Sequence, residues 1–329
     1  MATPKTSPFQ RNRLLRDAIG RALYDAMRAD SAIYLLGEGC QVKVHYDYPD
    51  IEKDFSDRLL TLPIAEDSSV NFAVGVSLLG VKPVVNLITA DFAFRAADSM
   101  INTAAKLNFV LPDGEPPRTI VIQAEFLLGG PTTGQRPEAL FVHIPGINVV
   151  IPSTPRAAYG LMRTALMSPG VTLFFEDRMI RDANFKPWHL DYEQKQFFPF
   201  GAGENRVYAR DPRIAVLAYG LMCQEVEAVV DQEGMDTVQL VDLQTLFPLN
   251  MTYIAHLVHR TRKLLIVEPD VRFGGIGAEI VAQLQEQLDV PFKVVRLGGP
   301  REVIPASRAG QARMMPSREQ ILEAIRGLL

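Results

Sequence analysis

Short apolar runs alternate with longer amphipathic stretches along nearly the whole 329-residue chain. The first half contains the runs AIYLLG, KPVVNLI, RTIVIQA and VTLFFE, and helical periodicity fills much of the sequence between them. This alternation is typical of parallel strands joined by crossover helices. The sequence therefore predicts an α/β protein with doubly wound, mainly parallel sheets.

The expected strands cover 32–37, 60–65, 82–88, 118–124, 147–152, 171–176, 214–220, 238–243, 263–268 and 292–298. The expected helices cover 11–29, 68–80, 92–107, 154–167, 221–234, 250–259, 276–288 and 317–328, with Ser153 as the cap of the fourth. A stretch rich in Pro, Gly and charge interrupts the alternation. We therefore expect a first domain at 1–190, a linker at 191–213 and a second domain at 214–329.

Composition narrows the class of protein. The hydrophobic content of 47% is typical of a globular chain, and a net charge of −4 gives no basis for binding nucleic acid. No apolar run approaches the roughly 20 residues that a membrane helix needs. The two cysteines, Cys40 and Cys223, match no disulfide or metal pattern and suit a reducing compartment. We expect a cytoplasmic enzyme or enzyme subunit with no metal site of its own.

Acidic residues follow several of the predicted strands. Glu38, Glu66, Asp91 and Glu125 come at or just after the carboxyl ends of the first four. Open α/β sheets bind their ligands at this edge. For any one of these acids a solvated loop position or a helix cap is the ordinary alternative.

For Glu66 the alternative is a role in capping a helix, because it lies in the run LPIAEDSS just before a predicted helix. Asp67, Ser68 or Ser69 can cap that helix, which leaves Glu66 without a capping role. A carboxyl group that follows LPIA is expected to be partly desolvated, which suits it to proton exchange.

The stretch TLPIAEDSSVNFAVGVSLLGVKPVVNLITADFAFRAADSMINTAAK resembles the beta subunit of the thiamine diphosphate-dependent component of 2-oxo-acid dehydrogenase complexes, in the transketolase superfamily. That group includes the pyruvate, branched-chain and acetoin enzymes. The segments LLGEG, GQRPEALFVHIPGINVVIPSTP, LAYG, VDLQTLFPLN and IVEPDVRFGGIGAEI agree in order and spacing. The resemblance covers nearly the whole chain.

This resemblance implies a transketolase-like pyrimidine-binding domain followed by a transketolase C-terminal domain. It implies that Glu66 hydrogen-bonds N1′ of the cofactor's aminopyrimidine and so activates the cofactor by proton exchange. Phe92 corresponds to an aromatic residue that stacks on the pyrimidine. Ile64 corresponds to a residue lining the same pocket, and Glu38 to an acid near the pyrimidine edge.

The family's GDG…NN motif, which holds Mg²⁺ and the diphosphate, is absent from this sequence. In two-chain members that motif lies on the alpha subunit. The resemblance therefore implies an alpha partner that carries GDG…NN and holds the Mg²⁺, a shared thiamine diphosphate site, and an α2β2 heterotetramer.

The substrate side departs from the family pattern. Beta subunits normally carry His-Ser-Gln where this chain has Thr133-Gly134-Gln135, and that histidine is linked to transfer onto a lipoyl group. The preceding loop, AEFLLGG, introduces Glu125, and IPASRAGQARMMPS replaces the usual run near the C-terminus. Candidate substrate-pocket residues are Glu125, Thr133, Gln135 and His143, although His143 also suits a structural role before a strand.

Three functions remain open. The chain could be a conventional dehydrogenase subunit working with a lipoyl acyltransferase. It could belong to a standalone two-subunit decarboxylase, carboligase (acyloin synthase) or transketolase-like enzyme that acts on a 2-oxo acid or ketose-like substrate without lipoyl transfer, which the missing histidine favours. It could also be a non-catalytic scaffold, which the retention of Glu66 and Phe92 argues against.

Overall fold

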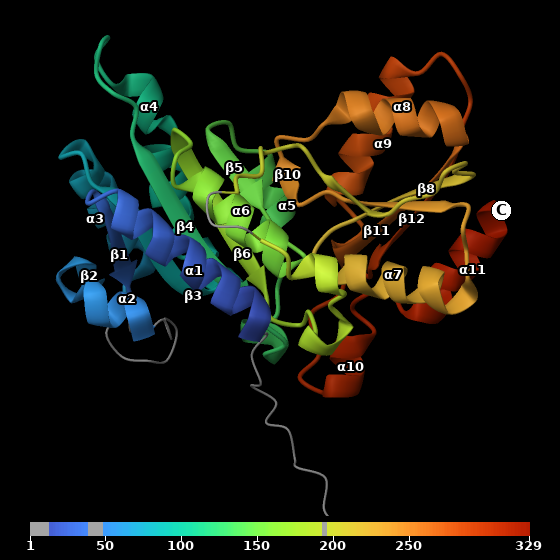
Figure 1. Cartoon of the computed structure of the whole chain (residues 1–329), viewed down its shortest axis with the longest axis horizontal. Helices are drawn as coiled ribbons and strands as arrows, with labels where there is room; N and C mark the ends of the chain where they lie inside the picture. Colours follow the sequence, from blue (N-terminus) through green and yellow to red (C-terminus); the bar gives the residue numbers. More distant parts are fainter. Residues whose placement is uncertain (1–12, 39–48, 193–195) are drawn as a thin grey trace, which may run out of the picture.

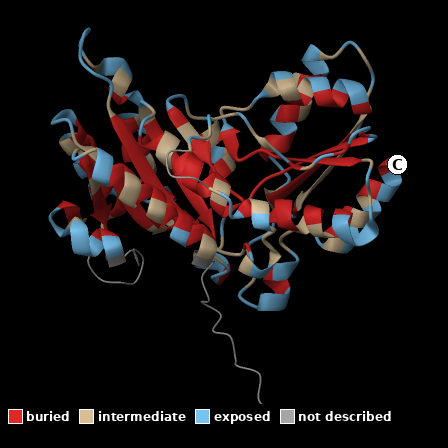
Figure 2. Ribbon diagram, in the orientation of Figure 1, coloured by how far each residue is buried: buried red, intermediate tan, exposed pale blue. Residues whose placement is uncertain are grey.

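A computed structural model describes residues 13–38, 49–192 and 196–329. It has two lobes, each built from one mainly parallel sheet with helices packed against it (Figure 1). The strands are largely buried, and the outer faces of the helices carry most of the exposed residues (Figure 2). The predicted fold class, two mainly parallel α/β sheets, is confirmed.

The first sheet has seven strands in the order β10-β5-β6-β4-β3-β1-β2. Its members are β1 (Ile33–Gly37), β2 (Leu59–Thr61), β3 (Lys82–Thr89), β4 (Thr119–Phe126), β5 (Ile147–Val150), β6 (Gly170–Asp177) and β10 (Thr245–Phe247). Neighbouring strands run parallel except for β10, which pairs antiparallel with β5. The carboxyl ends of β1, β3 and β4 therefore share one edge of the sheet.

Helices cover both faces of this sheet. On one face α1 (Arg13–Ala29) packs against α6 (Pro155–Ala165), and apolar side chains of both join one buried cluster. On the other face α3 (Glu66–Leu78) packs against β3 within a second cluster. Two short helices, α2 (Pro49–Asp54) and α5 (Glu138–Val142), were not predicted.

The second sheet has the order β12-β11-β8-β9-β7. Its strands are β7 (Glu204–Val207), β8 (Ile214–Ala218), β9 (Val238–Asp242), β11 (Lys263–Val271) and β12 (Lys293–Gly299). Its helices are α7 (Leu221–Glu233), α8 (Met251–Thr261), α9 (Ile276–Gln287), α10 (Arg308–Ala312) and α11 (Arg318–Leu328). In Figure 1, α8 and α9 lie on one side of this sheet and α7 and α11 on the other.

Two strands depart from the predicted division into domains. β7 lies inside the stretch predicted as a linker and pairs antiparallel with β9. β10 follows β9 in the chain but adds to the edge of the first sheet. The domain boundaries themselves stay a prediction.

Local structure differs from prediction in two helices. The segment predicted as one helix at 92–107 is a series of short turns, including a π-helical turn at Ser99–Thr103, that ends in α4 (Leu107–Val110). Thr154, not Ser153, caps α6, and its hydroxyl accepts from the N–H of Ala157 at 3.0 Å. The hydroxyl of Ser153 instead accepts from Nη1 of Arg206 and donates to the buried carboxylate of Asp242.

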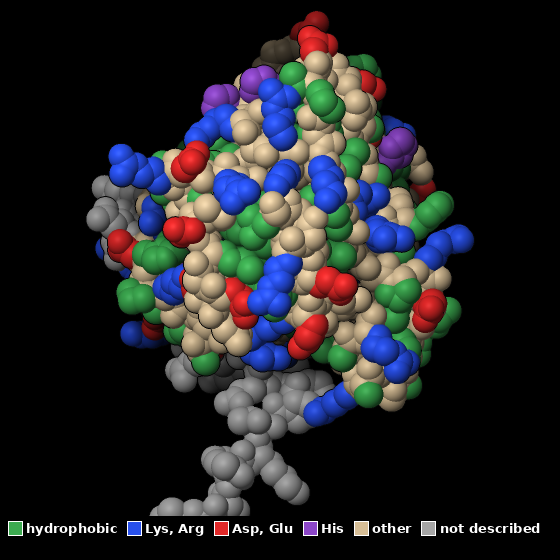
Figure 3. Space-filling model, turned by 90° about the vertical axis from the view of Figure 1, so that its right-hand side faces the viewer, with side chains coloured by type: hydrophobic (Ala, Val, Ile, Leu, Met, Phe, Trp, Pro, Cys, Tyr) green, Lys and Arg blue, Asp and Glu red, His purple; other side chains and the backbone are tan. Residues whose placement is uncertain are grey.

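One face of the molecule is mixed in charge. Figure 3 shows Lys and Arg side chains interspersed with Asp and Glu, with hydrophobic side chains between them. Among the described residues, no helix combines the length and apolar character needed to cross a bilayer.

Candidate functional site

Glu38 and Glu66 lie at the carboxyl edge of the first sheet. Glu38 follows the last residue of β1, and Glu66 is the first residue of α3. The predicted strand at 60–65 extends too far, because β2 ends at Thr61. The helix α3 begins at Glu66, two residues before the predicted start at 68. Both carboxyl side chains are buried, with 6% of Glu38 and 8% of Glu66 exposed.

The charge of Glu66 acts on Glu38. Burial and the nearby charge of Glu66 raise the pKa of Glu38, and the backbone N–H of Ala65 partly opposes this by hydrogen-bonding the Glu38 carboxylate. The Oε1 atom of Glu38 is buried and has no hydrogen-bond partner among the described residues. Buried oxygens are rarely left unpaired, so this atom points to a missing donor.

The predicted capping role of Asp67, Ser68 or Ser69 is wrong. Ala65 is the cap residue of α3, and no side chain caps this helix. The carboxylate of Asp67 instead accepts a hydrogen bond from the hydroxyl of Ser99, which also donates to the backbone oxygen of Asp67 at 3.0 Å. Asp67 therefore fastens the start of α3 to the turns that follow β3, leaving Glu66 beside Glu38.

Phe92 and Ile64 are the other two predicted cofactor-site residues, and they differ in exposure. Phe92 lies half-buried in the 3₁₀ turn Ala90–Phe94, directly after β3, the neighbour of β1. Ile64 is 81% exposed, which is unusual for isoleucine. An exposed Ile64 beside a buried carboxyl pair is a candidate contact for a ligand or a second chain.

Gln135 connects this edge to the loop after β4. Its side-chain amide and its backbone N–H both donate to Oδ1 of Asp91, at 3.1 and 3.2 Å. Burial raises the pKa of Asp91, and the two hydrogen bonds from Gln135 oppose that shift. The loop with Thr133-Gly134-Gln135 therefore lies against the turn that carries Phe92.

The other substrate-pocket candidates have different contacts. Glu125 is held by Arg178 at 2.9 Å and approached by Arg16 of α1 at 3.9 Å, with its side chain 5% exposed. Thr133 packs on Gly129, where an added Cβ would lie 1.7 Å from the threonine hydroxyl. His143 is exposed at the end of α5, before the amino end of β5. Of these candidates, Gln135 hydrogen-bonds to the turn that carries Phe92, and Glu125 lies opposite Thr89 at the end of β3.

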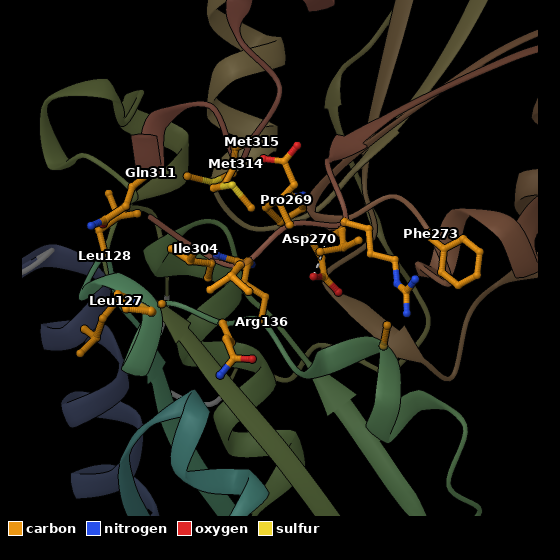
Figure 4. Close-up of a pocket in the computed structure, with 18 of the residues that line it drawn as sticks. Leu127, Leu128, Arg136, Pro269, Asp270, Phe273, Ile304, Gln311, Met314 and Met315 are labelled. Atoms are coloured by element: carbon orange, nitrogen blue, oxygen red, sulfur yellow. Dashed lines mark hydrogen bonds between the residues drawn. The ribbon is translucent and has the colours of Figure 1, made fainter. Parts of the chain in front are cut away.

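Arg136 and Asp270 are residues that the sequence pattern did not single out. The Arg136 guanidinium pairs with Asp177 at 3.0 Å and with Glu138 at 3.2 Å, and it stacks on Phe126. Burial and the charge of Glu138 raise the pKa of Asp270 to about 8. Arg136, Asp270 and Gln135 line a cavity of about 700 Å³ (Figure 4). Their grouping depends on contacts between the lobes, which no local motif signals.

Comparison with known proteins agrees with this architecture. Residues 12–181 match the family model "Transketolase, pyrimidine binding domain", and residues 203–321 match "Transketolase, C-terminal domain". The chain is 32% identical to the pyruvate dehydrogenase E1 component subunit beta of Gracilaria tenuistipitata var. liui, over 96% of this chain and 99% of that protein. The chain belongs to the family of 2-oxo-acid dehydrogenase E1 beta subunits.

Other members of this E1 beta family match over most of their length. The 2-oxoisovalerate dehydrogenase subunit beta of Bacillus subtilis (strain 168) is 30% identical over 86% of this chain and 88% of that protein. A solved structure titled "Split gene transketolase, inactive beta4 tetramer" superposes with a TM-score of 0.79 at 21% identity, covering 96% of this chain and 98% of that one. Because the sequence identity to this solved structure is only 21%, the similarity supports the fold alone.

Proposed function

We propose that this chain is the beta-type subunit of a heteromeric thiamine diphosphate-dependent enzyme and that Glu66 provides the carboxyl group that activates the cofactor. The observation that carries the proposal is the buried pair of Glu38 and Glu66, together with the half-buried Phe92 in the turn after the neighbouring strand β3. The unpaired Oε1 of Glu38 fits an aminopyrimidine, which has N–H donors to offer. When bound, the cofactor supplies a carbanion-stabilising centre for decarboxylation or for cleavage and formation of C–C bonds.

Each residue of the pair has a separate role in this proposal. Glu66 holds and exchanges a proton at the pyrimidine ring nitrogen, as the resemblance to the family implies. Glu38, whose pKa is raised, accepts from the exocyclic amino group at the neighbouring edge. Phe92 offers an aromatic face for stacking. The exposed Ile64 then becomes covered when the cofactor and a partner chain assemble on this edge.

The partner in this proposal is an alpha chain with the GDG…NN motif, which holds the diphosphate and Mg²⁺. Among the residues that the structure describes, no group of three or more His, Cys, Asp or Glu could hold a metal ion. The assembly we expect is α2β2, with each active site shared between an alpha and a beta chain.

A reaction without lipoyl transfer is the second candidate. The position of the family histidine is taken by Thr133-Gly134-Gln135, and the Gln135 amide is bonded to Asp91. These side chains offer no titrating group near neutral pH. This favours a decarboxylase, carboligase or transketolase-like activity over acyl transfer to lipoamide.

The test is product analysis of the co-expressed alpha and beta chains. Substrates are a panel of 2-oxo acids with and without aldehyde acceptors, and with and without lipoamide. We expect Glu66→Gln to abolish turnover, whereas the exposed control Glu115→Gln retains it. Near-normal activity of Glu66→Gln would contradict the cofactor role and favour a scaffold. Acylation of lipoamide by the wild-type pair would contradict the second candidate alone.

A further inference from the structure

Most of the lining of the cavity of about 700 Å³ comes from three segments that are distant in the sequence, and Phe94 and Met179 complete it. The three segments are the loop after β4, the end of β11 with its following turn, and the segment 301–315 after β12. In Figure 4, Leu127 and Leu128 lie on one side, Phe273 lies on the other, and Met314 and Met315 close the top. All of these residues belong to this chain.

Most of the wall is apolar. It includes Leu127, Leu128, Ile304, Met314 and Met315. Cavities of about 300–1,000 Å³ with apolar walls and a few polar groups are typical of sites for small organic ligands. The two methionines can adjust to the shape of a bound group, because their side chains are unbranched and flexible.

Two buried polar atoms of cavity-lining residues lack partners. Gln311 is 4% exposed; its Nε2 donates to the backbone oxygen of Ala306 at 3.1 Å, and its Oε1 has no partner. The Arg136 side chain is 6% exposed, and its Nη1 also has no partner. Leaving buried donors and acceptors unpaired is costly, so both atoms point to a ligand with a hydrogen-bonding group.

The charge around the cavity favours an uncharged ligand. The positive charge of Arg136 is already paired with Asp177 and Glu138. The raised pKa of Asp270, about 8, leaves this carboxyl group mainly protonated at neutral pH. Arg301 and Glu302 at the mouth carry opposite charges.

We propose that this cavity binds an uncharged organic molecule of medium size, with an aliphatic or aromatic body and a carbonyl or amide group that hydrogen-bonds to Gln311 or Arg136. The site is distinct from the carboxyl pair, because neither Glu38 nor Glu66 lines it. It adjoins that pair through Gln135, which lines the cavity and bonds to Asp91. Binding requires neither the cofactor nor the alpha chain.

The test is calorimetric titration of the full chain with acetamide, butanamide and hexanamide. We expect affinity to rise about fourfold per added CH₂ group, because each buried CH₂ contributes about 0.8 kcal/mol. Ala139, on α5, lines the cavity, and Ala139→Trp is expected to fill it and remove hexanamide binding. The matched control Ala312→Trp places the same side chain at an exposed position outside the cavity and should bind as the wild type does.

A second variant keeps the test independent of how well Ala139→Trp folds. Gln311→Leu removes the polar atoms at nearly constant volume and is expected to weaken hexanamide binding about 3–10-fold. Gln285→Leu, at an exposed position on α9, is the control. Affinity independent of chain length, or unchanged affinity in Ala139→Trp and Gln311→Leu, would overturn the proposal. Binding lost on assembly with the alpha chain would also overturn it, since the cavity would then be an assembly surface.

Discussion

The side-chain nitrogen of Gln135 donates to Oδ1 of Asp91 at 3.1 Å, and the backbone N–H of Gln135 donates to the same oxygen at 3.2 Å. One carboxylate oxygen therefore holds the loop after β4 against the turn after β3. Phe92 is adjacent to Asp91 in that turn, and Gln135 lines the cavity. This pair links the proposed cofactor edge to the proposed ligand cavity.

Replacing Asp91 with alanine should release that loop. Two hydrogen bonds to a mostly buried carboxylate are lost, so we expect Asp91→Ala to reduce the free energy of unfolding by about 1–3 kcal/mol. Urea denaturation measures this change. The control is Asp98→Ala, an exposed position in the same segment whose carboxylate accepts from Asn102 at 2.7 Å, with an expected change below about 0.5 kcal/mol. Equal effects of the two variants would contradict the role of Asp91.

Gly220 is required where α7 meets the first lobe. It has φ +55°, and a Cβ there would lie 2.9 Å from Oδ2 of Asp177, which accepts from Leu221 N–H and from Arg136. We expect Gly220→Ala to cost at least about 2 kcal/mol, because backbone strain adds to a displaced carboxylate. The measurement is again denaturant unfolding.

Gly234 provides the matched control for Gly220. It also has a left-handed backbone, with φ +62°, but a Cβ there meets nothing within 4 Å. Gly234→Ala should cost only about 1 kcal/mol of conformational strain. If both variants lose the same stability, the close approach of Asp177 is not the cause.

The sequence pattern predicted the two mainly parallel sheets, and it placed Glu66 at the carboxyl edge of the first sheet. Apolar runs with the right spacing predicted the buried strands, because a strand buried on both faces needs apolar side chains throughout. The two parallel sheets and the edge that carries Glu38 and Asp91 followed from that pattern. The role of Glu66 came from the family resemblance and remains a prediction.

What the sequence pattern missed depends on tertiary partners. The carboxylate of Asp67 has the chemistry of a cap, but it bonds to Ser99, 32 residues away, so local rules assigned it wrongly. Ser153 failed as a cap for the same reason, because Asp242 of the second lobe accepts its hydroxyl proton. Glu125 was predicted at the ligand edge, and its ion pairs with Arg16 and Arg178 could not be predicted from the local sequence. All of these partners are distant in the sequence, and Asp242 lies in the other lobe, so no local pattern reveals them.

Glu38 should reduce the stability of the isolated chain. Burial and the charge of Glu66 raise its pKa, so its contribution to stability is greatest at low pH and is lost as pH rises through the raised pKa. We expect Glu38→Gln to be more stable than the wild-type chain at pH 8, by on the order of 1 kcal/mol, with the gain shrinking toward pH 4. Glu286→Gln, at an exposed position, should show no such gain. A loss of stability in Glu38→Gln at pH 8 would contradict this electrostatic account.

Glu227 should make the opposite contribution to the pH dependence of stability. Its side chain is 4% exposed; burial opposes its ionised form, but hydrogen bonds from His189, Arg206 and Lys186 prevail and lower its pKa to about 2. A carboxyl group whose pKa is lowered on folding stabilises the protein above its ordinary pKa of 4.5, and this stabilisation is lost as pH falls toward 2. The lowered pKa corresponds to about 3 kcal/mol at neutral pH.

Glu227→Gln should therefore reduce the free energy of unfolding by about 3 kcal/mol at pH 7, and the difference from the wild type should narrow as pH falls from 4.5 to 3. Denaturant unfolding across this pH range measures both values. The control is Glu233→Gln on the same helix, whose partner Arg326 is 2.6 Å away and whose side chain is 27% exposed. Because exposed ion pairs contribute little, the control should lose less than about 1 kcal/mol. A pH-independent difference in Glu227→Gln would mean that lost packing, not the paired charge, causes the destabilisation.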